Sequence, residues 1–215
     1  MKNLCFLAFC LLWGFSSCNA QTKKSGKVDQ RVNLTPPKGK AIAAFAEGCF
    51  WCSEHIFESV AGIDSVVSGY AGGTKAYPTY EEVSSETTGH AEAVLIYYNP
   101  QKISYRELLK VFFTSHDPTT KDQQGPDFGS SYRSVIFYRN ADEKTRAEMA
   151  IKELSRSGQF RKPIVTELQP LNNFWRAEEY HQDFAKKNPN QGYIKAVSMP
   201  RFERFKKAYG PKKSK

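Results

Sequence analysis

The alternation of short apolar runs with amphipathic stretches is the pattern that most limits what this chain can fold into. Residues 91–99, "AEAVLIYYN", form an apolar run that Pro100 stops, and residues 104–116, "SYRELLKVFFTSH", begin with a capping Ser and repeat apolar side chains at helical spacing. Strands are predicted at 40–46, 66–73, 91–99, 134–140 and 163–168, and helices at 53–63, 104–116, 142–158 and 176–187. This order predicts an α+β or α/β sandwich, and 215 residues favour a single domain.

The positive charge is concentrated at the two ends of the chain. The formal net charge is +9, but residues 1–40 and residues 201–215 each carry a net +6, which leaves residues 41–200 at −3. A body without surplus positive charge has nothing to neutralise a phosphate backbone. The sequence therefore predicts no nucleic-acid partner, and it assigns residues 201–215 to a basic C-terminal tail.

The first twenty residues have the layout of a signal peptide. Lys2 is followed by about a dozen apolar residues, a run that is too short to span a bilayer comfortably. The small-residue stretch "SSCNA" comes next. Cleavage before Cys18 would leave a lipid anchor on that cysteine, whereas cleavage after Ala20 would release a soluble protein. We expect an exported protein, periplasmic or envelope-anchored, and favour a bacterial lipoprotein. Residues 21–40 are polar and contain a Pro pair, which predicts a flexible linker.

Two cysteines remain in the mature domain, Cys49 and Cys52, within "EGCFWCSEHIF". The loop that they would close is too short to stabilise a fold by a disulfide, and no second pair of metal-ligating residues completes a zinc site. A redox pair is therefore predicted, with no metal. Cys49 falls where a strand turns into a helix, a position that favours its thiolate, and Cys52 lies one helical turn further on, within reach of an oxidised Cys49.

Two other functions are compatible with the residues alone. A general thiol:disulfide oxidoreductase would use the two cysteines directly, and a non-catalytic binding protein would use the aromatic side chains between them. The histidines His90, His116 and His181 are interpreted as hydrogen-bonded structural residues.

Six motifs in register then resemble a known family. They are "GCFWCSEHIFESVAGI", "SGYAGG", "YPTYEEV", "TTGHAEAV", "HDPTT" and "DFGSSYRSVIFY". Together they closely resemble peptide methionine sulfoxide reductase of the A type, over residues 41–200. The resemblance implies a single-domain α/β two-layer sandwich with a mixed sheet and a ferredoxin-like order of strands and helices.

The resemblance also implies a role for each site residue. It makes Cys49 the nucleophile and Glu92 the acid that protonates the sulfoxide oxygen, and the strand around Glu92 suggests that its carboxyl points inward, where burial would keep it protonated. The remaining positions hold the oxygen, order the polar cluster or seat the substrate methyl group: Tyr80, Tyr132, Asp127, Phe50 and Trp51.

The recycling residues depart from the family pattern. Many members carry Gly where this chain has Cys52, some carry a resolving cysteine where it has Ser84, and no cysteine follows residue 52. Cys52 is therefore predicted to resolve the oxidised Cys49, with thioredoxin or a similar dithiol as external reductant and no bound cofactor. The alternative is a direct attack of the external reductant on the Cys49 sulfenic acid. By resemblance, the substrate is the S epimer of methionine sulfoxide, free or in oxidised proteins of the cell envelope.

Overall fold

The computed structural model describes residues 30–210. The predicted signal peptide, with Cys18, lies outside the described residues, as do residues 21–29 of the predicted linker and the last five residues of the predicted tail.

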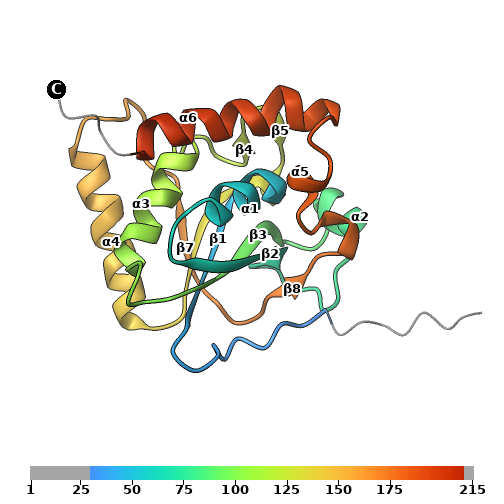
Figure 1. Ribbon diagram of the computed structural model, residues 1–215, viewed down its shortest axis with the longest axis horizontal. Helices are drawn as coiled ribbons and strands as arrows, with labels where there is room; N and C mark the ends of the chain where they lie inside the picture. Colours follow the sequence, from blue (N-terminus) through green and yellow to red (C-terminus); the bar gives the residue numbers. More distant parts are fainter. Residues whose placement is uncertain (1–29, 211–215) are drawn as a thin grey trace, which may run out of the picture.

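The body of the molecule is a six-stranded mixed sheet (Figure 1). Its strands are β1 (Ala41–Glu47), β2 (Ile63–Ala71), β3 (Ala91–Tyr98), β6 (Ser134–Tyr138), β7 (Glu167–Pro170) and β8 (Trp175–Arg176), and β4 (Gln123–Gln124) and β5 (Asp127–Phe128) form a separate hairpin. The order in the sheet is β7-β6-β1-β3-β2-β8, with β6 and β7 parallel and the other neighbours antiparallel. The prediction of one α/β domain with a mixed sheet is confirmed.

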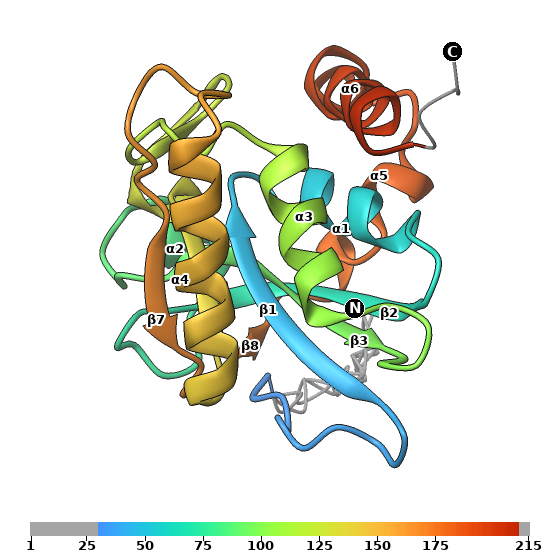
Figure 2. The ribbon, with the colours of Figure 1, turned by 90° about the vertical axis from the view of Figure 1, so that its left-hand side faces the viewer.

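Helices cover one face of this sheet. They are α1 (Phe50–Glu58), α2 (Tyr80–Ser84), α3 (Tyr105–Ser115), α4 (Ala141–Arg156), α5 (Phe184–Lys187) and α6 (Met199–Tyr209). Side chains of α1, α3, α4 and α6 share one core cluster with β1, β3 and β6, and α3 and α4 run side by side in Figure 2. The predicted cap at Ser104 is confirmed, since its side chain accepts from the Glu107 N–H. The helix predicted from residue 142 begins at Ala141, because Asn140, placed by the prediction in the preceding strand, caps it by accepting from the Glu143 N–H.

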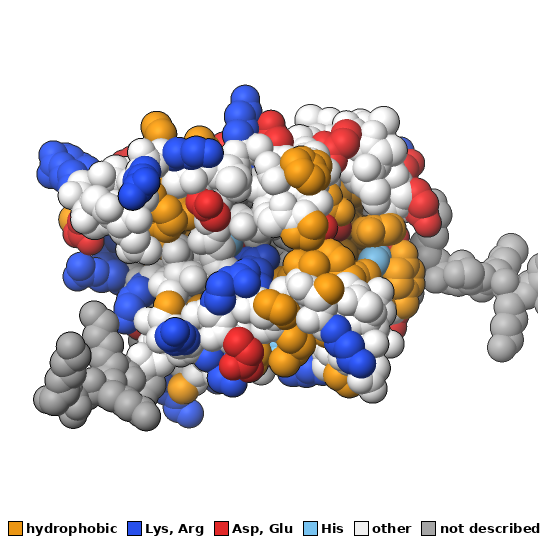
Figure 3. All heavy atoms as spheres, turned by 90° about the horizontal axis from the view of Figure 1, so that it is seen from above, with side chains coloured by type: hydrophobic (Ala, Val, Ile, Leu, Met, Phe, Trp, Pro, Cys, Tyr) orange, Lys and Arg blue, Asp and Glu red, His pale blue; other side chains and the backbone are white. Residues whose placement is uncertain are grey.

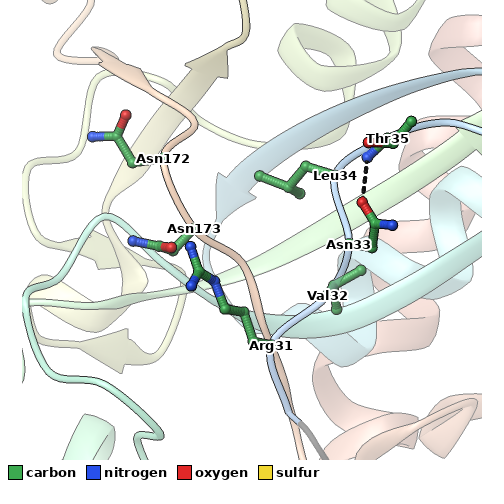
Figure 4. A pocket seen from close by; sticks show the side chains of 7 residues that line it. All are labelled: Arg31, Val32, Asn33, Leu34, Thr35, Asn172 and Asn173. Atoms are coloured by element: carbon green, nitrogen blue, oxygen red, sulfur yellow. Dashed lines mark hydrogen bonds between the residues drawn. The ribbon is translucent and has the colours of Figure 1, made fainter.

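The opposite face of the sheet is covered by extended chain. A second core cluster there includes Leu95 and Phe137, and Val32 and Leu34 pack against it. The Val32 N–H donates to the Phe174 carbonyl at 2.9 Å, which ties the N-terminal segment to the loop before β8. A pocket of about 470 Å³ lies between these two segments (Figure 4). Residues 30–35 of the predicted linker are therefore bound to the domain.

The prediction of a basic tail from residue 201 onward is wrong for residues 201–209, which belong to α6. Arg201 and Phe205, four residues apart, are 6 % and 2 % exposed and face the core, while the charges between them stay at the surface. Figure 3 shows Lys and Arg side chains over the face that carries α6. The domain therefore continues to Tyr209. Composition did not indicate this helix, because its two inward-facing residues lie in a segment that is basic on average.

One predicted helix is wrong. Residues 176–187 form two short turns, Glu179–His181 and Phe184–Lys187, separated by Asp183 with a φ of 55°. The polar side chains of this segment bind other elements instead of continuing a helix. The Gln182 amide bonds both backbone groups of Ser68, and the Glu178 carboxylate accepts from the Tyr70 hydroxyl.

Candidate active site

Cys49 lies at the turn from β1 to α1, as predicted. Gly48 has a φ of 88°, and a Cβ at this position would lie 2.5 Å from the Cβ of Gln124, so only glycine fits. Cys49 is the N-cap residue of α1 and is 7 % exposed. The turn thus directs a buried sulfur toward the end of the sheet at which the 123–128 hairpin lies.

Glu92 extends from β3 to the same point. It is 4 % exposed, and its Oε2 accepts a hydrogen bond from the Phe50 N–H at 2.9 Å, next to Cys49. Burial raises the pKa of Glu92 to about 8, against the opposing effect of the Phe50 bond and with a further contribution from the Asp127 charge. The carboxyl is therefore mostly protonated at neutral pH and can donate a proton.

Aromatic side chains of α1 form the apolar side of the site. The Trp51 Nε1–H donates to His181 Nδ1 at 3.1 Å, and the Trp51 ring stacks on Phe184 with 3.9 Å between the ring centroids. Phe50 packs against Tyr70 and His181. Both rings next to Cys49 are held rigidly, which suits them to bind a small apolar group.

Two phenols come from separate loops. Tyr80 begins α2, and its N–H donates to Glu178 Oε1 at 2.9 Å. Tyr132 ends a short 3₁₀ turn whose preceding serines, 130 and 131, both donate to the Glu86 carboxylate. Burial, followed by the negative charge of Glu92, raises the pKa of both phenols, so they are hydrogen-bond donors at neutral pH.

Cys49, Glu92 and their neighbours line one cavity of about 280 Å³. Its lining residues are Cys49, Phe50, Trp51, Tyr80, Glu92, Asp127, Tyr132, Gln191 and Tyr193. The cavity thus brings together every site residue that the sequence predicted except Cys52.

Two lining residues were missed by the sequence prediction, Gln191 and Tyr193. The Tyr193 hydroxyl donates to Asp127 Oδ2 at 2.5 Å, and burial raises the pKa of Asp127 against the effects of this bond and of Arg201. Nothing in "NQGYIKAV" marks either residue, because they approach the site only through the fold of the C-terminal segment.

Cys52 lies behind Cys49 and is 2 % exposed. The two thiols are free and hydrogen-bonded to one another, and the Ser198 Oγ lies 2.9 Å from the Cys52 Sγ. Burial raises the pKa of the Cys49 thiol, whereas the hydrogen bond from Cys49 lowers that of Cys52 to about 6 against burial, with the help of Arg201. The two thiols therefore titrate as a pair that shares its first ionisation. Burial therefore opposes the Cys49 thiolate that the helix N-terminus is expected to favour.

The histidines are hydrogen-bonded structural residues, as predicted. His90 accepts from the Gly73 N–H, His116 bridges the Phe112 carbonyl and the Ser134 hydroxyl, and His181 orients Trp51. Within residues 30–210, no group of three His, Cys, Asp or Glu side chains is placed to hold a metal ion.

Comparison with known proteins agrees with this site. A family model described as peptide methionine sulfoxide reductase matches residues 41–214. The peptide methionine sulfoxide reductase MsrA 1 of Rhodopirellula baltica is 47 % identical over 181 residues, which cover 84 % of this chain and 93 % of that protein.

Two solved structures of Mxr1 from Saccharomyces cerevisiae share the fold. The reduced form has a TM-score of 0.68 at 34 % identity, covering 72 % of this chain and 89 % of that one. Mxr1 in complex with Trx2 has a TM-score of 0.51 at 27 % identity, covering 71 % and 94 %. The chain therefore belongs to the peptide methionine sulfoxide reductase family of the MsrA type, oxidoreductases that act on methionine sulfoxide.

Proposed function

We propose that this protein reduces the S epimer of methionine sulfoxide, free and in oxidised proteins, by a thiol and sulfenic acid cycle. The observation that carries the proposal is the cavity of about 280 Å³, in which the Cys49 sulfur faces a protonated carboxyl, Glu92, and the phenols Tyr80 and Tyr132. Preference for the S epimer follows from the family resemblance.

The first half-reaction transfers oxygen to Cys49. Cys49 attacks the sulfoxide sulfur as the thiolate of the pair, while Glu92 gives a proton to the departing oxygen, which the two phenols hold. The oxygen ends on Cys49 as a sulfenic acid, and the substrate leaves as the thioether methionine. Phe50 and Trp51 bind the substrate methyl group, and Asp127 orders the polar side of the cavity through Tyr193.

The second half-reaction regenerates the thiols. Cys52 attacks the sulfenic acid, and a thioredoxin-like dithiol then reduces the disulfide, without a bound cofactor. Two observations support this step. Cys52 already contacts Cys49 by a hydrogen bond, and the related Mxr1 was solved in complex with Trx2.

The cellular location is proposed from the sequence. Residues 1–20 support export, with a lipid anchor on Cys18 or cleavage after Ala20, and repair would then take place in the cell envelope. Among the described helices, none is long and apolar enough to cross a bilayer.

A finer fold class is part of the proposal. The order β1-α1-β2-β3-α3-β6, with β6-β1-β3-β2 as neighbours in the sheet, supports a ferredoxin-like core to which β7 and β8 are added at the edges.

An epimer assay tests the proposed activity. The domain is incubated with each sulfoxide epimer, free and N-acetylated, with dithiothreitol as reductant, and methionine is measured. We expect product from the S epimer and none from the Cys49→Ser variant. A general disulfide oxidoreductase would instead exchange disulfides at the same rate in wild type and Glu92→Gln. Absence of methionine from both epimers would refute the proposal.

A further inference from the structure

The surroundings of Cys52 come from the C-terminal helical segment. Ser198, which precedes α6, places its Oγ 2.9 Å from the Cys52 Sγ, and both residues are buried. Arg201, three residues further on, is 6 % exposed and lines the same cavity of about 370 Å³ as Cys52. This cavity lies next to the substrate cavity and does not include Cys49.

Arg201 is a buried cation whose position is fixed by two bonds. Its Nη2 donates to Glu47 Oε1 and its Nε to the Ser115 carbonyl, both at 2.8 Å. Glu47 is fully buried, and burial raises its pKa to about 7 against the effects of Arg201 and Ser115. Near neutral pH this carboxylate is only partly ionised, so the Arg201 charge is not fully balanced by Glu47.

Arg201 can therefore also act on a second anion, and Cys52 lines the same cavity and feels the Arg201 charge. The other titratable groups that act on Cys52 or are acted on by it are Cys49, Asp127, Glu47, Glu92 and Tyr193. Cys49 favours the Cys52 thiolate by a hydrogen bond, the carboxylates oppose it, and Arg201 is the cation among these groups.

We infer that Ser198 and Arg201 form a thiolate-binding site, which holds Cys52 as a thiolate and makes it the resolving nucleophile of the cycle. This inference rests on the proposed function. Ser198 contacts the reacting sulfur, and Arg201 is a positioning residue that acts through its charge.

The chemistry of the step is balanced without a further reagent. The Cys52 thiolate attacks the Cys49 sulfenic sulfur, the sulfur–sulfur bond forms and the sulfur–oxygen bond breaks. The Cys52 thiol gives its proton to Glu92 on ionising, which restores the acid form, and the oxygen leaves as water after it takes this proton from Glu92. The same thiolate-binding site stabilises Cys52 as the leaving thiolate when an external dithiol attacks the Cys49 sulfur of the disulfide.

Single-turnover experiments without reductant test the thiolate-binding site. They compare the Ser198→Ala and Arg201→Met variants with wild type. All three should still form one equivalent of methionine, because Cys49 and Glu92 are unchanged. At pH 5, below the Cys52 pKa of about 6, disulfide formation should slow by roughly tenfold, the effect of one pKa unit on the thiolate fraction, and dimedone should trap the sulfenic acid that accumulates.

The ionisation of Cys52 gives a readout that a structural role would not move. In a Cys49→Ser background, the pH midpoint for iodoacetamide alkylation of Cys52 should rise when Arg201→Met is added. Arg204→Met is the matched control, since Arg204 lies on the same helix and lines the same cavity but is exposed. Glu47→Gln combined with Arg201→Met removes the buried unpaired carboxylate and should restore folding but not the midpoint.

The inference would be overturned by two results together. One is an equal rate of disulfide formation in wild type and Ser198→Ala, and the other is an unchanged alkylation midpoint in Arg201→Met or in the Glu47→Gln/Arg201→Met double variant. A wild type that forms no methionine would instead reject the proposed function.

Discussion

Replacing Glu92 with Gln should stabilise the protein and inactivate it. The Glu92 pKa rises from 4.5 to about 8 on folding. Below pH 4.5 the folded and unfolded chains both hold the proton. Between pH 4.5 and about 8 only the folded chain keeps it, so stability falls as pH rises, by about 1.4 kcal/mol per pH unit. The cost is roughly 3 kcal/mol at pH 7, about 1 kcal/mol at pH 5, and constant above the folded pKa.

The Glu92→Gln side chain cannot ionise and still offers an oxygen to the Phe50 N–H. Its free energy of unfolding from urea titrations should exceed that of wild type by up to about 3 kcal/mol at pH 7 and by much less at pH 5. The rate of methionine formation should fall about 10²–10⁴-fold, as expected when a proton donor is lost. The wild-type rate should decline above pH 8, where Glu92 ionises.

Glu54→Gln is the matched control. Glu54 is 2 % exposed, accepts from the Asp183 N–H at 2.9 Å and has its pKa raised to about 8 by burial and then by the charge of Glu58, but it does not line the substrate cavity. Its replacement should stabilise the protein in the same pH window and leave the rate of methionine formation unchanged. The reasoning is wrong if Glu92→Gln keeps the wild-type rate, or if its stability follows that of wild type from pH 5 to pH 7.

Three further predictions concern the resolving thiol, a phenol and the N-terminus. Cys52→Ser should keep one equivalent of methionine per enzyme in a single turnover but lose most of its steady-state rate with a thioredoxin-like reductant; an unchanged steady-state rate would exclude Cys52 as the resolving residue. Glu86→Ala should release the turn that carries Tyr132, because its carboxylate binds both preceding serines, and should raise KM or lower kcat with an unchanged circular dichroism spectrum; kinetics equal to wild type would show that Tyr132 needs no such support. Mass spectrometry of the native protein should show an acylated Cys18, and a chain that begins at Gln21 would reject the lipid anchor.

Local sequence was sufficient for the elements that depend on their own residues. The runs that became β1, β3 and β6 are apolar except at Glu47, Glu92 and Ser134, because these strands are buried on both faces. Helices α3 and α4 carry their caps and their apolar stripe within a single window. The strand–Gly–Cys–helix turn at Cys49 was equally local, since Gly48 alone permits it.

Elements whose conformation depends on distant partners were predicted poorly. Residues 176–187 have the composition of a helix, but Glu178 and Gln182 bind side-chain and backbone groups of β2 and Asp183 takes a left-handed conformation. The composition of the segment after residue 200 did not predict that α6 packs on the core. The segment is basic on average, and only two of its residues face inward.

The sequence by itself determined the redox pair, the turn that carries it and, through resemblance, the residues around the substrate cavity. Only the tertiary structure decided how those groups ionise, because burial and charge come from elements remote in sequence. Glu92 keeps its proton since the fold removes it from water. The pKa of Cys52 is lowered first by its neighbour Cys49 and then by Arg201 and Ser198, which reach it from nearly 150 residues further along the chain.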